Sequence, residues 1–189
     1  MTRQRALVLV LLLAGIVAGG PAWAQEQGQV GVNLGFPTVG VTWHATDTIA
    51  MRPEFTFMFG STSSSQGSGV EASEADQWGL GFGLSALFYL REWDGLRGYI
   101  APRFAIVHAS TDSIATTSGS KRKTSGNNYD LGAIAGVQYA ISSRLNVFGE
   151  LGLGYSNRRS ETEGPGSTDL ETTTWALAPR SAIGLIVYF

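Results

Sequence analysis

The chain has 189 residues, of which 43% are hydrophobic and only 15% charged, and its formal net charge is −2. So low a charged fraction argues against a disordered chain, and the slight negative charge leaves no basic surface for DNA or RNA. The sequence contains no cysteine, which excludes disulfide scaffolds, thiolate zinc sites and cysteine nucleophiles. The 25 glycines are about twice the average share, although no collagen-like triplet repeat accompanies them.

The N-terminal segment has the pattern of a secretory signal peptide. Two arginines precede an apolar run over residues 6–18, and small residues stand at positions −3 and −1 of a cut after Ala24. The run is too short for a transmembrane helix, which needs about 20 apolar residues. We therefore predict export with cleavage after Ala24, which divides the chain into a signal peptide over 1–24 and a single domain over 25–189.

Through the rest of the chain, bulky apolar residues alternate with small or polar ones at a period of two, which is typical of β-strands. Eight segments alternate in this way, and the connections between them are long and short in turn. This alternation of long and short connections favours an up-and-down barrel whose long loops all lie at one end. The sequence therefore predicts an all-β, eight-stranded antiparallel barrel. The expected strands cover residues 30–36, 39–43, 49–59, 77–90, 100–106, 129–139, 145–155 and 175–189, with long loops at 60–76, 108–127 and 156–173.

Five mid-strand charges all fall on the face that carries small and polar residues, away from the bulky apolar face. A soluble barrel would also separate polar from apolar residues, but with the apolar face inside. The composition of the polar face therefore has to decide which face lies inside. A water-facing surface carries about 25–35% Lys, Arg, Glu and Asp. This face is instead mostly Gly, Ala, Ser and Thr, which suits the narrow interior of an eight-stranded barrel. The apolar face is therefore expected to meet lipid, which makes the barrel transmembrane. The five lumen charges are Arg52, Glu54, Arg103, Glu150 and Arg180.

Aromatic residues gather near both ends of the expected strands, as in the two belts by which barrels meet the membrane interfaces. One belt would comprise Phe59, Trp78, Tyr129, Tyr155 and Trp175, and the other Trp43, Phe88, Tyr99, Tyr139, Tyr188 and Phe189. Each lumen arginine also has a proline beside it, at Pro53, Pro102 and Pro179. Because proline removes a hydrogen-bond donor from the ladder, we expect a bulge at each of these positions.

The whole pattern resembles the small outer-membrane β-barrel family and is similar to the transmembrane domain of OmpA and to OmpX. The chain ends in Leu185-Ile186-Val187-Tyr188-Phe189. The terminal Phe189, with Val187 and Leu185 at alternate positions before it, resembles the signal that the barrel-assembly machinery recognises in that family. The resemblance implies an outer-membrane location in a Gram-negative-type cell, with both termini in the periplasm and the long loops outside. It implies little about function.

Two roles are open for the lumen charges. Buried charges must be paired or hydrogen-bonded, so the five side chains can form a polar network that plugs the barrel. Alternatively, they line an ion path. An eight-stranded barrel leaves little room for a channel, which favours the plugged lumen over a porin-like narrow pore.

The expected role is therefore structural or one of surface interaction, with an adhesin as one alternative. The expected partners are outer-membrane lipids and lipopolysaccharide, and an extracellular ligand or host surface bound through the loops. The basic cluster Lys121-Arg122-Lys123 suits lipopolysaccharide phosphates, but a charge run of this kind is more often a solvated loop. We expect no nucleic-acid partner, no metal and no other cofactor, because no basic surface and no cluster of metal-ligating residues occurs in the sequence.

One pair of residues raises the alternative of an enzyme. His108 and Ser110 stand at the outer end of a strand and resemble the catalytic pair of lipid A deacylase barrels, in which histidine activates serine for ester attack. The sequence departs from that family because Thr111 and Asp112 follow the serine where Asn-Ala-Gly is expected. No carboxylate stands in an obvious place to orient the histidine. We therefore expect a protein that is not an enzyme, with a hydrolase using His108 and Ser110 as the alternative.

Overall fold

The computed structural model describes residues 27–36, 38–64, 73–115, 121–164 and 170–189. The predicted signal peptide and the cut after Ala24 lie outside these residues and stay predictions. None of the described residues forms a helix long and apolar enough to cross a membrane.

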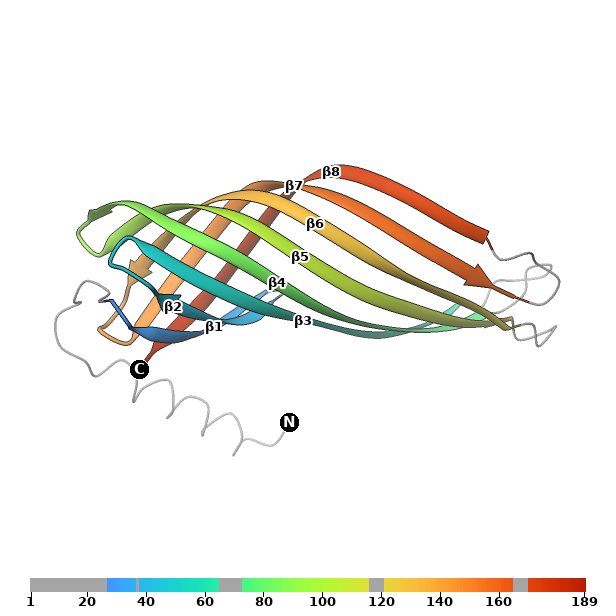
Figure 1. Ribbon diagram of the computed structural model, residues 1–189. Helices are drawn as coiled ribbons and strands as arrows, with labels where there is room; N and C mark the ends of the chain where they lie inside the picture. Colours follow the sequence, from blue (N-terminus) through green and yellow to red (C-terminus); the bar gives the residue numbers. More distant parts are fainter. Residues whose placement is uncertain (1–26, 37, 65–72, 116–120, 165–169) are drawn as a thin grey trace, which may run out of the picture.

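Eight antiparallel strands form one closed barrel, which confirms the predicted fold (Figure 1). Each strand pairs with its neighbours in the sequence, and β1 closes the ring by pairing with β8. The strands are β1 (Val30–Phe36), β2 (Val39–His44), β3 (Ile49–Ser64), β4 (Ser73–Trp93), β5 (Leu96–Ala115), β6 (Lys121–Ala140), β7 (Leu145–Glu163) and β8 (Leu170–Tyr188).

Short connections at residues 45–48, 94–95 and 141–144 lie at one end of the barrel, which we call the short-turn end. The C-terminus lies at this end too (Figure 1). At Asp94 and Gly95 the backbone has positive φ values of 47° and 78°. An Asp-Gly pair of this kind is the favoured sequence for a two-residue hairpin turn, because both positions tolerate that conformation.

The three long loops expected from the sequence are largely strand. The pairing of β3 with β4 continues to Ser64 and Ser73, and that of β5 with β6 continues to Ile114 and Lys121. The loops expected at 60–76, 108–127 and 156–173 are therefore mostly wrong. Beyond the apolar band both faces of these strands are polar, so the alternation that marks a strand in the sequence disappears. Serine and threonine nevertheless pair well across strands, and the ladders continue.

β1 and β2 are much shorter than the other strands and divide the barrel into two parts. β1 pairs with β8 only as far as Ile183, and β2 pairs with β3 only as far as Phe55. Among the described residues, no ladder pair joins β3 or β8 to a strand across this gap beyond those positions. We call the stretch that contains all strands the eight-stranded part, and the stretch beyond it, built from β3 to β8 alone, the six-stranded part.

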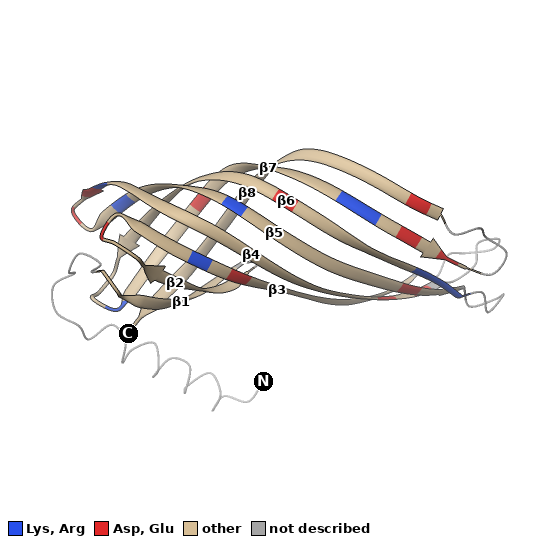
Figure 2. Cartoon of the chain, viewed as in Figure 1, with Lys and Arg blue, Asp and Glu red and all other residues tan. Residues whose placement is uncertain are grey.

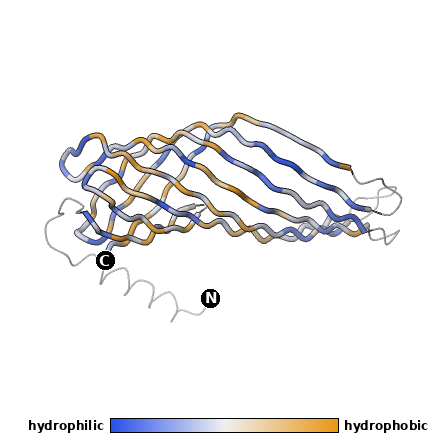
Figure 3. The backbone as a smooth tube through the Cα atoms, in the orientation of Figure 1, coloured by the Kyte–Doolittle hydropathy of each residue, from blue (hydrophilic) through white to orange (hydrophobic). Residues whose placement is uncertain are grey.

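The outward face carries a broad apolar band, and polar residues follow toward the far ends of the long strands (Figure 3). Leu131, Leu151 and Leu177 on this band are each more than half exposed. The aromatic residues assigned to the two belts are exposed except at two positions: Tyr99 and Tyr188 are only 2% and 1% exposed and lie inside the ring. Both alternate with outward-facing neighbours, so strand parity places them in the lumen.

The bulges expected at the three prolines do not form. The register continues without a shift on both sides of Pro53, Pro102 and Pro179, and the one irregularity among the described residues lies between Tyr89 and Arg91. Instead, a ladder pair is absent on one side of each proline. Pro53 has no partner on β2, Pro102 has none on β4, and Pro179 lies where β8 has no neighbour on its outer side. Each missing N–H thus falls where a ladder pair is absent, so no bulge is needed.

Candidate functional site

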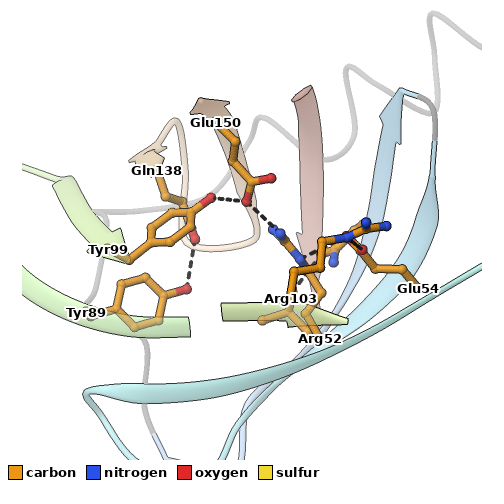
Figure 4. Close-up of polar contacts among 9 residues, drawn as sticks. Arg52, Glu54, Tyr89, Tyr99, Arg103, Gln138 and Glu150 are labelled. Carbon is orange, nitrogen blue, oxygen red and sulfur yellow. Dashed lines mark hydrogen bonds and ion pairs between the residues drawn. The ribbon is translucent and has the colours of Figure 1, made fainter. Parts of the chain in front are cut away.

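Four of the five predicted lumen charges form one chain of ion pairs across the interior (Figure 4). Arg52 of β3 lies 3.2 Å through Nε from Glu54 Oε1 and 2.6 Å through Nη2 from Glu150 Oε1. Arg103 of β5 donates from Nε to Glu54 Oε2 at 2.8 Å. The Arg52 side chain is only 1% exposed. The cost of removing these charges from water is offset because each one has an opposite charge beside it.

A layer of polar side chains continues this chain toward the short-turn end. The Tyr99 hydroxyl donates to Glu150 Oε1 at 2.7 Å and so joins the layer to the ion pairs. Gln138 accepts from the Tyr89 hydroxyl at 3.0 Å and donates to the Tyr188 hydroxyl at 3.1 Å. The layer comprises His44, Tyr89, Tyr99, Gln138 and Tyr188, all of them buried. The Tyr89 and Tyr99 rings, 5.5 Å apart between centroids, bring this layer against the ion-pair chain inside the eight-stranded part.

The fifth predicted charge, Arg180 of β8, lies apart from this network and pairs with Asp130 of β6. Asp130 also accepts from Asn128 Nδ2 at 2.9 Å. The sequence analysis missed Asp130, although it stands on the inward parity of its strand, between Tyr129 and Leu131. Arg180 stands three residues beyond Ile183, where the pairing of β1 with β8 ends, and Figure 2 shows charged residues along the middle of the strands.

Glycine residues provide the space for these large lumen side chains. A Cβ atom at Gly136 would overlap the Tyr99 ring, and one at Gly154 would overlap the Arg180 side chain. At Gly149, by contrast, a Cβ atom would meet nothing within 4 Å. Part of the glycine excess thus reflects an interior that has to accommodate Arg and Tyr in a narrow ring.

His108 and Ser110 lie on the same strand, β5, but they are not arranged as a catalytic pair. His108 is exposed, contacts Trp78 at 5.5 Å between ring centroids, and forms a 2.9 Å hydrogen bond through Nδ1 with Asn127 Oδ1. Ser110 is 2% exposed, and its hydroxyl has no hydrogen-bond partner in the described part of the chain. The histidine is thus oriented by an amide and does not contact the serine, which lacks the geometry that nucleophile activation requires.

The remaining predicted residues lie at opposite ends of the barrel. Leu185 and Val187 face outward beside the short-turn end, and the terminal Phe189 is 82% exposed there. The basic cluster over residues 121–123 begins β6 rather than lying in a loop, and Lys123 stands across from both Asp112 and Glu163 in the register. No group of three or more His, Asp or Glu side chains among the described residues is arranged to hold a metal ion.

A closed ring of eight antiparallel strands, apolar outside and ion-paired inside, is the architecture of the small outer-membrane barrels. A major outer membrane protein from Thermus thermophilus shares this fold with a TM-score of 0.56 at 11% identity, over 85% of this chain and 98% of that one. CarO2 from Acinetobacter baumannii matches with a TM-score of 0.45 at 16% identity, over 87% and 100% of the two chains. The N-terminal barrel domain of Pseudomonas aeruginosa OprF matches with a TM-score of 0.42 at 14% identity, also over 87% and 100%. No family model and no curated protein matches the sequence.

Proposed function

We propose that the protein is an integral outer-membrane barrel whose lumen is closed by its polar network and whose role is structural or one of surface interaction. The observation that carries the proposal is the ion-pair chain from Glu150 through Arg52 and Glu54 to Arg103. Together with the buried tyrosines, this chain occupies the ring where all strands are present. An ion crossing it would have to break several buried charge pairs, each costly to separate.

Conductance across a planar bilayer tests the closed lumen. We expect no discrete conductance from the refolded full chain, because the ion-paired side chains lie across the narrow lumen. Removing two adjacent lumen side chains together, with Tyr99→Ala and Glu150→Ala, should open a small conductance. The outward Leu151→Ala variant is the matched control and should stay silent. Discrete channels from the unaltered protein would overturn the proposal in favour of a narrow pore.

Fractionation of cells tests the proposed location. The fold and the outward apolar band support an outer-membrane barrel, and the N-terminal pattern supports export. We expect the protein in the outer-membrane fraction, with a mobility on gels that changes on heating and a mature chain that begins at Gln25. A heat-insensitive protein in the soluble fraction would contradict the proposal. Deleting Phe189 should reduce the amount assembled, because this residue is exposed at the end of β8, where the assembly machinery could bind it.

The surface role is supported by the extent of the paired strands beyond the apolar band. They hold charged residues of both signs far from the lumen network (Figure 2), including the basic cluster over residues 121–123. Such a surface suits phosphate groups of lipopolysaccharide or an extracellular ligand. Replacing all three basic residues with Gln should weaken binding to purified lipopolysaccharide, and unchanged binding would count against this part of the proposal.

A further inference from the structure

In the six-stranded part, β3 and β8 face each other as edges that no ladder pair joins among the described residues, and we call the stretch between them the opening. At the level of β1 and β2, these two strands are separated by three strand spacings of about 4.8 Å, or about 14 Å along the wall. Beyond Phe55 and Ile183 the two strands continue, but the described residues contain no ladder pair that bridges them. Outward-facing Phe57, Phe59 and Leu177 border the opening and are more than half exposed. The opening therefore begins within the apolar band, where a barrel meets lipid.

The free edge of β8 has a feature found on natural edge strands. Proline lacks the N–H that a neighbouring strand would use, so within sheets it is confined mainly to edges. Pro179 lies in the portion of β8 that has no neighbour on its outer side, and the β7 pairing beside it remains in register. Unpaired backbone at membrane depth is tolerated where it lines a water-filled cavity. The sequence is thus compatible with an edge that stays open to the lumen.

Behind the opening, the six-stranded part encloses a cavity of about 400 Å³, a size within the range of ligand pockets, about 300–1,000 Å³. Its two sides differ. The side formed by β3 and β5 is mainly apolar, with Met58, Val107 and Ala109 beside one polar residue, Thr56. Met58 and Val107 lie against Gly79 and Gly81 of β4, where an added Cβ would meet them at 2.8 Å. The side formed by β6, β7 and β8 is mainly polar and is lined by Asn128, Ser156, Arg158 and Thr174, together with the small Gly126 and Ala176.

The polar side carries one arginine that the barrel does not neutralise. Arg158 lines the cavity, and among the described residues it forms no ion pair. The other lumen arginines are compensated, Arg180 by Asp130 and Arg103 by Glu54. The lumen thus has a surplus positive charge beside hydrogen-bonding side chains, and guanidinium groups bind carboxylate and phosphate well.

We propose that this cavity binds a single-chain anionic amphiphile, a long-chain carboxylate. The anionic head group would lie against Arg158 on β7. The acyl chain would lie on the apolar side, over Met58 and Val107, and leave through the opening past Phe57 into the lipid. The ion-paired network below forms the floor of the site, so the ligand has access from the side and not along the barrel axis.

Binding of cis-parinaric acid, a fluorescent long-chain carboxylate, to the refolded full chain in micelles tests the proposal. We expect saturable binding that weakens at least tenfold in Arg158→Ala. The matched control is Arg159→Ala, one residue away on the outward face, which should bind like the unaltered protein. The uncharged methyl ester should bind weakly to the unaltered protein and to both arginine variants. Equal binding by the two arginine variants, or equal binding of acid and ester, would overturn the proposal.

The position of the chain is tested separately by quenching of tryptophan fluorescence. Trp175 borders the opening on β8, whereas Trp43 lies near the short-turn end, and both are exposed. A stearic acid brominated near its chain end should quench the fluorescence of Trp175 more strongly than that of Trp43. Quenching should therefore be lost in Trp175→Phe and kept in Trp43→Phe. Quenching that is the same in both variants and insensitive to Arg158→Ala would contradict access through the opening.

A second copy of the chain could instead cover the opening by pairing with the free edges of β3 and β8. Sedimentation of the same samples tests this alternative. A monomer that binds the acid supports the proposal, and a stable dimer that excludes it overturns it. The ligand proposal rests on the proposed outer-membrane location only for its source of lipid. Because binding is measured in micelles and without reference to conductance, either proposal can fail while the other stands.

Discussion

The two parts of the barrel share β3 to β8 but differ in how far their lumen charges are buried. In the eight-stranded part, Arg52 is 1% exposed and lies between two carboxylates, and three tyrosines are buried nearby. In the six-stranded part, the Arg180 side chain is 35% exposed although it is paired. Where β1 and β2 are missing, this arginine is thus partly open to solvent, although its partner Asp130 is only 5% exposed. Ending two strands early therefore exposes the longer side chain of the pair and leaves the carboxylate buried.

The largest difference between the two parts is expected in backbone hydrogen exchange. In β8, amides of residues 183–188 are bracketed by β1 and β7, whereas residues 170–182 have β7 alone. About every second amide in the latter segment should therefore exchange faster by orders of magnitude, because unpaired N–H groups are open to solvent. Exchange measured by NMR in micelles checks this expectation. β6, paired on both sides, is the internal control, and uniform protection along β8 would show that the edge is covered.

Arg52→Ala should produce the largest loss of stability among the single substitutions. It leaves Glu54 and Glu150 buried without their shared partner, and breaking a buried ion pair in this way costs about 3–5 kcal/mol. The comparison variant, Arg180→Ala, leaves one buried carboxylate, Asp130, with its Asn128 hydrogen bond, so it should cost less than a change that strips two buried carboxylates of their partner. Unfolding in urea from lipid vesicles gives both values. Equal losses would mean that water reaches the two sites alike, and the contrast between the two parts would fail.

Substitution of glycine tests packing in the same way. Gly136→Ala places a Cβ atom against the Tyr99 ring, which is held by its bond to Glu150, so we expect a loss of about 1–3 kcal/mol from overpacking. Gly154→Ala meets the flexible, partly exposed Arg180 side chain and should cost less. Gly149→Ala, which meets open space, is the control. A larger loss at Gly154 than at Gly136 would contradict the expectation.

The sequence predicted the barrel because alternation with a period of two reports directly which side chains share a face. The same parity placed Arg52, Glu54, Arg103, Glu150 and Arg180 together before any contact was known. It did not predict that Arg180 pairs with Asp130, since that contact depends on the register between β6 and β8, which are separated by β7. The sequence did predict that the first two strands, at residues 30–36 and 39–43, are short. It did not predict the opening, because a gap between β3 and β8 follows only when the ring is closed and both short strands end before their neighbours.

Tyr188 gives the smallest predicted effect and the most local comparison. Its hydroxyl accepts a hydrogen bond from Gln138 Nε2 at 3.1 Å and lies 3.1 Å from His44 Nε2, all inside the eight-stranded part. Tyr188→Phe keeps the ring but leaves the Gln138 donor unsatisfied, so it should lower the free energy of unfolding by about 1 kcal/mol. Tyr139→Phe removes a hydroxyl from a side chain that is 48% exposed on the outer face and should change stability by much less. Equal effects in urea unfolding would indicate that the buried layer is hydrated, and that the eight-stranded part is less tightly closed than its contacts imply.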